Sequence, residues 1–212
     1  MNDILQKIQE IGIVPVIALD DAKDAEPLGA ALSKGGLLCA EITFRTAAAE
    51  ESIKIISKKF PHLLVGAGTV LTIEQVDKAV AAGAQFVVSP GFNPRIVAYC
   101  VKNNILMIPG CSSPSDIELA LEQGINVVKF FPAEQSGGLE YIKAIAAPYV
   151  GVKFMATGGI NPQNVKDYLA YNRIAACGGS WMVKSDLINH GKFDEIATLS
   201  KEAVEIVKNS RA

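Results

Sequence analysis

The chain has 212 residues, of which 50% are hydrophobic, and a formal net charge of -2 at neutral pH. We expect one globular domain spanning residues 1–212, because this length and composition suffice for a single core. Acidic and basic residues are mixed along the chain, so neither nucleic acid nor an anionic membrane is an expected partner.

The first residues, 1–12, carry charged side chains throughout and lack the apolar run of a signal peptide. No apolar run in the sequence is long enough to span a bilayer. No CxxC pair occurs among the four cysteines, which are Cys39, Cys100, Cys111 and Cys177. We therefore expect a cytoplasmic protein whose cysteines are buried, reduced thiols.

Eight apolar segments with the composition of buried strands alternate with helical segments. The predicted strands cover residues 14–19, 37–44, 63–67, 86–89, 105–108, 127–131, 153–156 and 174–177. A helix with an apolar face precedes the first strand and ends at Gly12, and a long amphipathic helix closes the chain. The spacing indicates a strand–helix repeat of roughly 25 residues.

Capping residues mark where several of these helices begin. A capping residue followed by proline recurs at Asn93-Pro94, Ser113-Pro114 and Asn161-Pro162. Thr72 and Gln75 have the spacing of a capping box.

Strict alternation predicts a parallel sheet with right-handed crossovers. Eight such units can close into a barrel, whereas an open doubly wound sheet is the alternative. Eight repeats in a short chain without a break in composition favour closure. We therefore predict an α/β fold, a single (β/α)8 TIM barrel with an extra N-terminal helix.

Lys129 stands inside the apolar strand segment 127–131. Burial lowers the pKa of a lysine because low dielectric disfavours the charged form. A fall of ~3 units from ~10.4 would leave roughly a third of such a side chain as neutral amine at neutral pH. A neutral amine can attack a carbonyl and form a Schiff base. The alternative is a lysine at a strand end whose ammonium reaches solvent.

The second strand carries Glu41, Thr43 and Arg45 at a spacing of two, which places them on one face. In a closed barrel this polar face would point inward, near the carboxyl ends of the strands where barrel active sites lie. An exposed edge strand is the alternative interpretation, but a closed barrel has no edge.

Glycine-rich turns follow several strands. Thr157-Gly158-Gly159 and Gly178-Gly179-Ser180 follow the seventh and eighth strands, where this architecture commonly binds phosphate through backbone N–H groups. Thr69 follows Gly66-Ala67-Gly68, whose glycines allow a close approach to the backbone. Ser89-Pro90-Gly91 and Pro109-Gly110 are predicted to be rigid turns.

The two histidines, His62 and His190, lie in polar loops without the spacing of metal ligands. No Walker loop and no GxSxG motif occurs in the sequence. We expect neither a metal ion nor a cofactor.

These residues together predict imine chemistry on a 2-oxo acid. Lys129 would form the imine, which draws electrons from the bond beyond the adjacent carbon. Arg45 and Thr69 could bind the carboxylate, and Glu41 could transfer protons. Alternatively, Glu41 and Arg45 form a buried ion pair without function.

Six segments, in order along the whole chain, resemble the class I 2-keto-3-deoxy-6-phosphogluconate (KDPG) aldolase and 4-hydroxy-2-oxoglutarate (KHG) aldolase family. They are residues 41–46, 65–70, 89–91, 128–134, 157–160 and 178–181. The resemblance implies a (β/α)8 barrel, as a homotrimer, that reversibly cleaves a phosphorylated 2-keto acid, KDPG, to pyruvate and glyceraldehyde 3-phosphate. KHG could also be cleaved, to pyruvate and glyoxylate.

The resemblance also implies roles for individual residues. Lys129 would be the Schiff-base lysine and Glu41 the general acid/base. The residues implied to bind substrate are Arg45 and Thr69 at the pyruvate part, Thr157 at C4, Gly158, Gly159, Gly179 and Ser180 at the phosphate, together with Pro90 and Phe131. A threonine at position 157 favours the gluconate over the galactonate epimer. An aldolase for the galactonate epimer and a non-catalytic phosphosugar-binding barrel are the alternatives.

Overall fold

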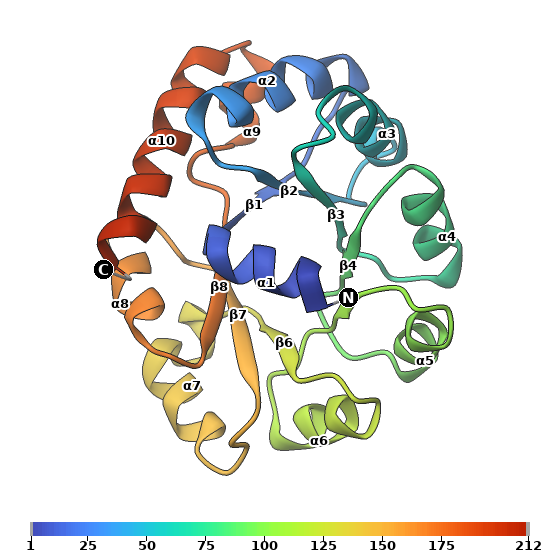
Figure 1. Cartoon of the computed structure of the whole chain (residues 1–212), viewed down its shortest axis with the longest axis vertical. Coiled ribbons are helices and arrows are strands. Elements are labelled where there is room, and N and C mark those ends of the chain that lie inside the picture. Colours follow the sequence, from blue (N-terminus) through green and yellow to red (C-terminus); the bar gives the residue numbers. More distant parts are fainter. Residues whose placement is uncertain (1, 211–212) are drawn as a thin grey trace.

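Eight parallel strands form a ring that is surrounded by helices (Figure 1). The computed structural model describes residues 2–210. The strands are β1 (Ile13–Ile17), β2 (Cys39–Thr43), β3 (Leu64–Gly68), β4 (Phe86–Val88), β5 (Met107–Ile108), β6 (Val127–Phe130), β7 (Lys153–Thr157) and β8 (Ile174–Gly179). Each strand agrees with its predicted segment to within two residues at either end.

The order of the strands distinguishes a barrel from an open sheet. Neighbouring strands follow the chain in the order β5-β4-β3-β2-β1-β8-β7-β6. The gap between β5 and β6 is closed by a parallel bridge between Gly110 and Lys129. This arrangement confirms the predicted TIM barrel. Because β2 pairs with both β1 and β3, the interpretation of its polar face as that of an exposed edge strand is wrong.

Helices cover the outside of the ring and pack on the outward faces of the strands (Figure 1). They are α2 (Ala25–Gly35), α3 (Ala49–Lys59), α4 (Ile73–Ala81), α5 (Pro94–Lys102), α6 (Pro114–Glu122), α7 (Gly138–Ala146), α8 (Val165–Ala170), α9 (Ser185–Asn189) and α10 (Phe193–Ser210). Short 3-10 helices, Ala22–Asp24 and Glu134–Ser136, precede α2 and α7.

Alternation along the strands separates two apolar clusters. In β2, Ala40 and Ile42 belong to the cluster between strands and helices, whereas Cys39 belongs to the cluster inside the ring. Glu41 follows Cys39 at a spacing of two and therefore also points inward. The predicted inward orientation is confirmed for Glu41.

Side-chain caps define the starts of several helices as the sequence predicts. Asn93 accepts from the N–H groups of Arg95 and Ile96, and Ser113 forms a complete capping box with Asp116. The predicted box at Thr72 is only half formed. Thr72 accepts from the Gln75 N–H, but the Gln75 side chain accepts from the Leu71 N–H instead of that of Thr72.

Helix α8 begins later than the Asn161-Pro162 pair predicts. Its first residue is Val165, and a turn fills residues 162–164. The Asn161 side chain accepts from the N–H groups of Gln163 and Asn164, which stabilises this turn in front of the helix.

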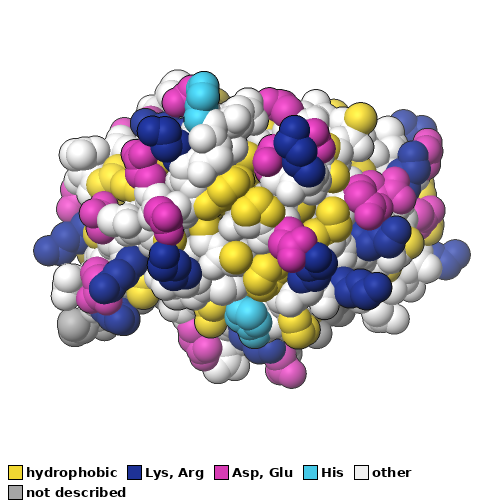
Figure 2. All heavy atoms as spheres, turned by 90° about the horizontal axis from the view of Figure 1, so that it is seen from above, with side chains coloured by type: hydrophobic (Ala, Val, Ile, Leu, Met, Phe, Trp, Pro, Cys, Tyr) yellow, Lys and Arg dark blue, Asp and Glu magenta, His cyan; other side chains and the backbone are white. Residues whose placement is uncertain are grey.

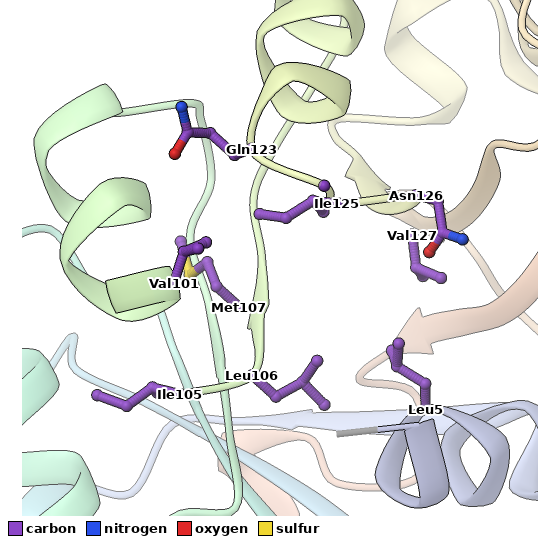
Figure 3. A pocket seen from close by; sticks show the side chains of 10 residues that line it. Leu5, Val101, Ile105, Leu106, Met107, Gln123, Ile125, Asn126 and Val127 are labelled. Atoms are coloured by element: carbon purple, nitrogen blue, oxygen red, sulfur yellow. The ribbon is translucent and has the colours of Figure 1, made fainter. Parts of the chain in front are cut away.

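Helix α1 (Asn2–Ile11) lies across the end of the barrel where the strands begin (Figure 1). Ile8 is buried in the inner cluster, and Ile4, Leu5 and Ile11 pack against it. A mainly apolar hollow of about 210 Å³ lies beside α1, between the starts of β5 and β6 (Figure 3). The helix therefore closes the barrel end opposite the predicted active site.

Charges of both signs are interspersed on the surface shown in Figure 2. Lys34 pairs with Asp194 at 2.8 Å, and Lys59 pairs with Glu26. All four side chains are exposed, so each pair contributes little to stability. Within residues 2–210, no helix combines the length and the apolar character needed to cross a membrane.

Candidate active site

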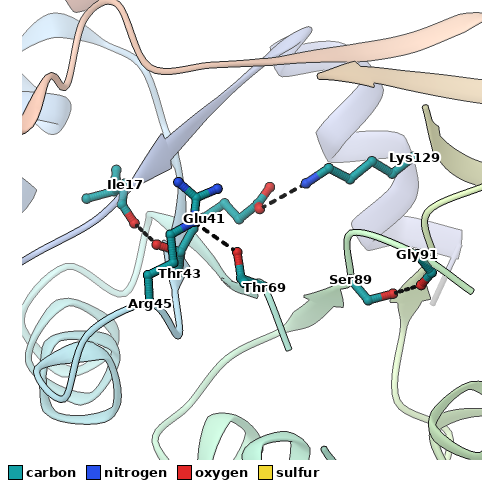
Figure 4. Close-up of polar contacts among 8 residues, drawn as sticks. All are labelled: Ile17, Glu41, Thr43, Arg45, Thr69, Ser89, Gly91 and Lys129. Carbon is teal, nitrogen blue, oxygen red and sulfur yellow. Dashed lines mark hydrogen bonds and ion pairs between the residues drawn. The ribbon is translucent and has the colours of Figure 1, made fainter. Parts of the chain in front are cut away.

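Lys129 and Glu41 face each other inside the barrel (Figure 4). The lysine Nζ lies 3.7 Å from Glu41 Oε1, and the two residues are 3% and 0% exposed. They come from β6 and β2, which lie on opposite sides of the ring. The prediction of a buried lysine is therefore confirmed, and the alternative of a lysine that extends into solvent is wrong.

Both oxygens of the Glu41 carboxylate are buried, and neither accepts a hydrogen bond from residues 2–210. Buried polar atoms are rarely left in this state, and the exceptions often serve a catalytic role. Cys39 precedes Glu41 by two residues on the same strand, and burial together with the nearby negative charge of Glu41 raises the pKa of this thiol. The carboxylate is thus well placed to exchange protons with a substrate bound at Lys129.

Two glycines provide the space that the polar side chains occupy. A Cβ at Gly68 would lie 2.2 Å from Glu41 Oε1, and a Cβ at Gly178 would lie 2.4 Å from Thr157 Oγ1. The sequence indicated a close approach to the backbone at Gly66 and Gly68, but not that the Glu41 side chain makes this approach. Thr157 Oγ1 is buried and, within residues 2–210, has no hydrogen-bond partner.

Arg45 and Thr69 meet at the mouth of the barrel (Figure 4), where Arg45 Nε donates to Thr69 Oγ1 over 3.3 Å. Thr69 has a φ of 54°, a backbone region that β-branched residues rarely adopt. Hydrogen bonds on either side hold this conformation, from Phe44 N–H to Gly68 O at 2.8 Å and from Val70 N–H to Val88 O at 3.2 Å. Backbone strain of this kind is typical of functional sites.

A hollow of about 190 Å³ opens beside these residues. Its walls include most of the predicted substrate-binding residues, namely Arg45, Phe131, Thr157, Gly158, Gly159, Gly179 and Ser180. Gly178, the first residue of the predicted turn after the eighth strand, also lines it. Val16 and Ile160 line it as well and were not predicted to bind substrate, because apolar residues carry no signal of their own. Phe131, which lines the hollow, is also close to the lysine, since its ring centroid lies 5.3 Å from Lys129 Nζ.

Pro90 is not brought to this hollow. Its carbonyl packs against Gly110, and the Ser89 hydroxyl donates to the Gly91 carbonyl over 2.7 Å. These contacts are those of a tight turn between neighbouring strand ends, which is the structural role predicted for this segment. A contact between Pro90 and substrate stays a prediction.

Comparisons with known proteins agree with this arrangement. A family model for KDPG and KHG aldolase matches residues 4–199. A 2-dehydro-3-deoxy-phosphogluconate aldolase from Haemophilus influenzae is 51% identical over 207 residues, which cover 98% of each chain.

Solved structures give the same result. One of them is KDPG aldolase from Legionella pneumophila, with pyruvate captured at low pH as a covalent carbinolamine intermediate. It has a TM-score of 0.90 at 38% sequence identity, and the match covers 94% of this chain and 97% of that chain. The Zymomonas mobilis enzyme, crystallised with 3-phosphoglycerate, has a TM-score of 0.87 at 39% identity, with 94% of both chains covered. The chain therefore belongs to the KDPG and KHG aldolase family of carbon–carbon lyases.

Proposed function

We propose that this chain is a class I aldolase that reversibly cleaves KDPG to pyruvate and glyceraldehyde 3-phosphate through an imine on Lys129. The observation that carries the proposal is the position of the buried Lys129 Nζ, which lies 3.7 Å from the Glu41 carboxylate. This carboxylate accepts no hydrogen bond from residues 2–210. A carboxylate at this distance can keep the amine oriented and exchange protons at the carbon that the amine attacks.

The first half of the reaction forms the imine. Lys129 passes a proton to the Glu41 carboxylate, and the resulting neutral amine attacks the C2 carbonyl. The carbonyl oxygen takes up the proton that the attacking nitrogen releases, which gives a carbinolamine. Glu41 then donates a proton to the departing hydroxyl, so that water leaves and a protonated imine remains. The carbinolamine in the Legionella relative supports this step.

The second half breaks the C3–C4 bond. Glu41, directly or through water, removes the proton of the C4 hydroxyl, and the electron pair of the C3–C4 bond moves into the imine as the aldehyde forms. The resulting enamine is protonated at C3, and water hydrolyses the imine to release pyruvate and the free lysine. No metal ion takes part in this scheme.

The substrate spans the two parts of the site. Arg45 and Thr69 would bind the carboxylate next to the reacting carbonyl, where the guanidinium offers paired donors. The phosphate would lie in the hollow, on the backbone N–H groups of the turns at Gly158–Gly159 and Gly179–Ser180. Arg45 lines that hollow as well, so its positive charge favours both anionic ends of the substrate.

Thr157 supports the gluconate epimer as the main substrate. Its buried hydroxyl has no partner within residues 2–210 and faces the space that Gly178 leaves. A substrate hydroxyl at C4 would complete this hydrogen bond, and the opposite epimer would leave it unmade. Kinetics with KDPG, its galactonate epimer and KHG decide between the three substrates.

Trapping with borohydride in the presence of pyruvate tests the imine directly. Reduction of the imine should leave one pyruvate-derived group on Lys129, detected by mass spectrometry of peptides. Lys153 is a matched control, because it is also a strand lysine but donates to Gln9 Oε1 at the far end of the barrel.

We expect Lys153→Gln to be labelled like the unchanged chain and Lys129→Gln to remain unlabelled. A folded protein without an adduct on Lys129 would overturn the mechanism and favour a non-catalytic phosphosugar-binding barrel. We also propose that the chain assembles as a homotrimer, which sedimentation velocity checks independently.

A further inference from the structure

The carbonyl of Gly159 accepts two side-chain hydrogen bonds. Asn161 Nδ2 donates over 3.0 Å and Asn164 Nδ2 over 3.1 Å. The oxygens of these carboxamides are also engaged: Asn161 Oδ1 accepts from the N–H groups of Gln163 and Asn164, and Asn164 Oδ1 accepts from the Asn161 N–H. Both side chains are therefore fixed on the backbone around the turn.

The two carbonyls before Gly159 are held by the segment after β6. Ala133 N–H donates to Thr157 O over 2.8 Å, and Glu134 N–H donates to Gly158 O over 3.1 Å. Three successive carbonyls thus accept hydrogen bonds from outside the turn. The backbone of the turn that follows β7 is consequently held by the segment after β6 and by the two asparagines before α8.

In a trans peptide, the N–H of each residue points opposite to the carbonyl before it. Fixing the carbonyls of Gly158 and Gly159 therefore directs the N–H groups of Gly159 and Ile160 to the other side. Neither of these N–H groups donates to an acceptor in residues 2–210. Both residues line the 190 Å³ hollow. Successive N–H groups that converge on a hollow form a binding site for anions.

The charges around the turn agree with an anionic ligand. Glu134 packs against Gly159, where a Cβ would lie 2.6 Å from the Glu134 Cβ. The Glu134 carboxylate accepts from the Tyr168 hydroxyl and lies next to Gly138, and Glu134 is not part of the hollow's lining. The cationic side chain in that lining is Arg45.

We infer that Asn161 and Asn164 are positioning residues for recognition of the substrate phosphate. They touch no substrate; by holding the Gly159 carbonyl they keep the adjoining N–H group aimed at the phosphate. This inference rests on the proposed cleavage of a phosphorylated substrate. It makes the preference for KDPG over the unphosphorylated KHG depend on two side chains outside the hollow.

Kinetics with the two substrates test the inference. Because both asparagines donate to one carbonyl, either alanine variant leaves a donor in place and should raise KM for KDPG by roughly threefold. The double variant Asn161→Ala with Asn164→Ala should raise it more than roughly tenfold, beyond the product of the single effects. KM for KHG should stay within about twofold, and inhibition by inorganic phosphate should weaken in parallel with KM for KDPG.

Asn161→Asp separates positioning from helix capping. An aspartate keeps the oxygen that accepts from Gln163 and Asn164, so the turn before α8 is preserved. It removes the donor to Gly159 and should still raise KM for KDPG. Asn93→Asp is the matched control, because Asn93 precedes proline in the same way but its oxygen caps α5 away from this turn.

The outcomes are distinguishable. If the unchanged chain cleaves neither substrate, the proposed function fails. If it cleaves both, but Asn161→Asp and the double alanine variant leave KM for KDPG unchanged, the inference is overturned. An equal rise of KM for both substrates together with a lower melting temperature would show a structural role and would also overturn it.

Discussion

Glu41 reaches Lys129 because the residue beside its carboxylate has no side chain. The closest approach is at Gly68, where a Cβ would lie 2.2 Å from Glu41 Oε1. The sequence identifies the reacting pair from the lone lysine of one strand and the inward acid of another. It does not identify Gly68 as a partner of Glu41, since the register between β2 and β3 pairs Glu41 with Gly66 and Gly68 with Thr43. Only the course of the Glu41 side chain brings its carboxylate to Gly68.

Gly68→Ala should therefore displace the carboxylate while leaving the lysine in place. We expect kcat for KDPG to fall by roughly 10²-fold, because proton transfer by a positioned group contributes this much or more. Borohydride trapping of pyruvate on Lys129 should persist. Gly91→Ala is the control, since a Cβ there would meet no atom within 4 Å. An unchanged kcat in Gly68→Ala would refute the positioning effect.

The cysteines should be unreactive in the folded protein. All four are buried, and burial raises the pKa of Cys100 to about 11 and that of Cys111 to about 12. The thiolate is the reactive form, so at about pH 8 iodoacetamide should modify these two only after denaturation. Mass spectrometry of the native and denatured protein checks this, and rapid modification of either thiol in the native state would contradict it.

At the level of helices and strands, the local signals predicted the type of each element better than its boundaries. Ser113 and Asn93 cap the helices that they were expected to start. Asn161 carries the same Asn-Pro signal, but α8 starts at Val165, because the asparagine serves the turn after β7 as well. The sequence around Asn161 indicates that it caps a helix, but does not show that its side chain also donates to the carbonyl of Gly159.

Removing the cap of α6 should lower stability without changing catalysis. In the box, Ser113 Oγ accepts from the Asp116 N–H over 3.2 Å, and Asp116 Oδ2 accepts from the Ser113 N–H over 3.0 Å. Ser113→Ala should cost ~1 kcal/mol, or roughly 2–4 °C in melting temperature. Ser115→Ala, at an exposed position in the same helix, should leave the melting temperature nearly unchanged. Equal melting temperatures for the two variants would show that the box contributes nothing.

At the level of the whole molecule, the number of strand–helix repeats predicted that the sheet closes into a barrel. Eight units in sequential order close the barrel, and strands four places apart in that ring face each other. This relation alone brings β2 opposite β6 and so brings Glu41 to Lys129. The glycine-rich turns predicted where the hollow beside Gly158 lies, but not its shape, which depends on carbonyls fixed by segments distant in the chain.

The backbone of Lys129 has a structural role at the junction between β5 and β6. Within residues 2–210, two backbone hydrogen bonds join these edges, Lys129 N–H to Pro109 O and Cys111 N–H to Lys129 O, each 2.8 Å long. The peptide groups of the reactive residue thus complete the cylinder. An insertion or shift that breaks these two hydrogen bonds would separate β5 from β6 and would also move the Lys129 amine away from its place in the site. A change at this residue would therefore affect barrel closure and catalysis together.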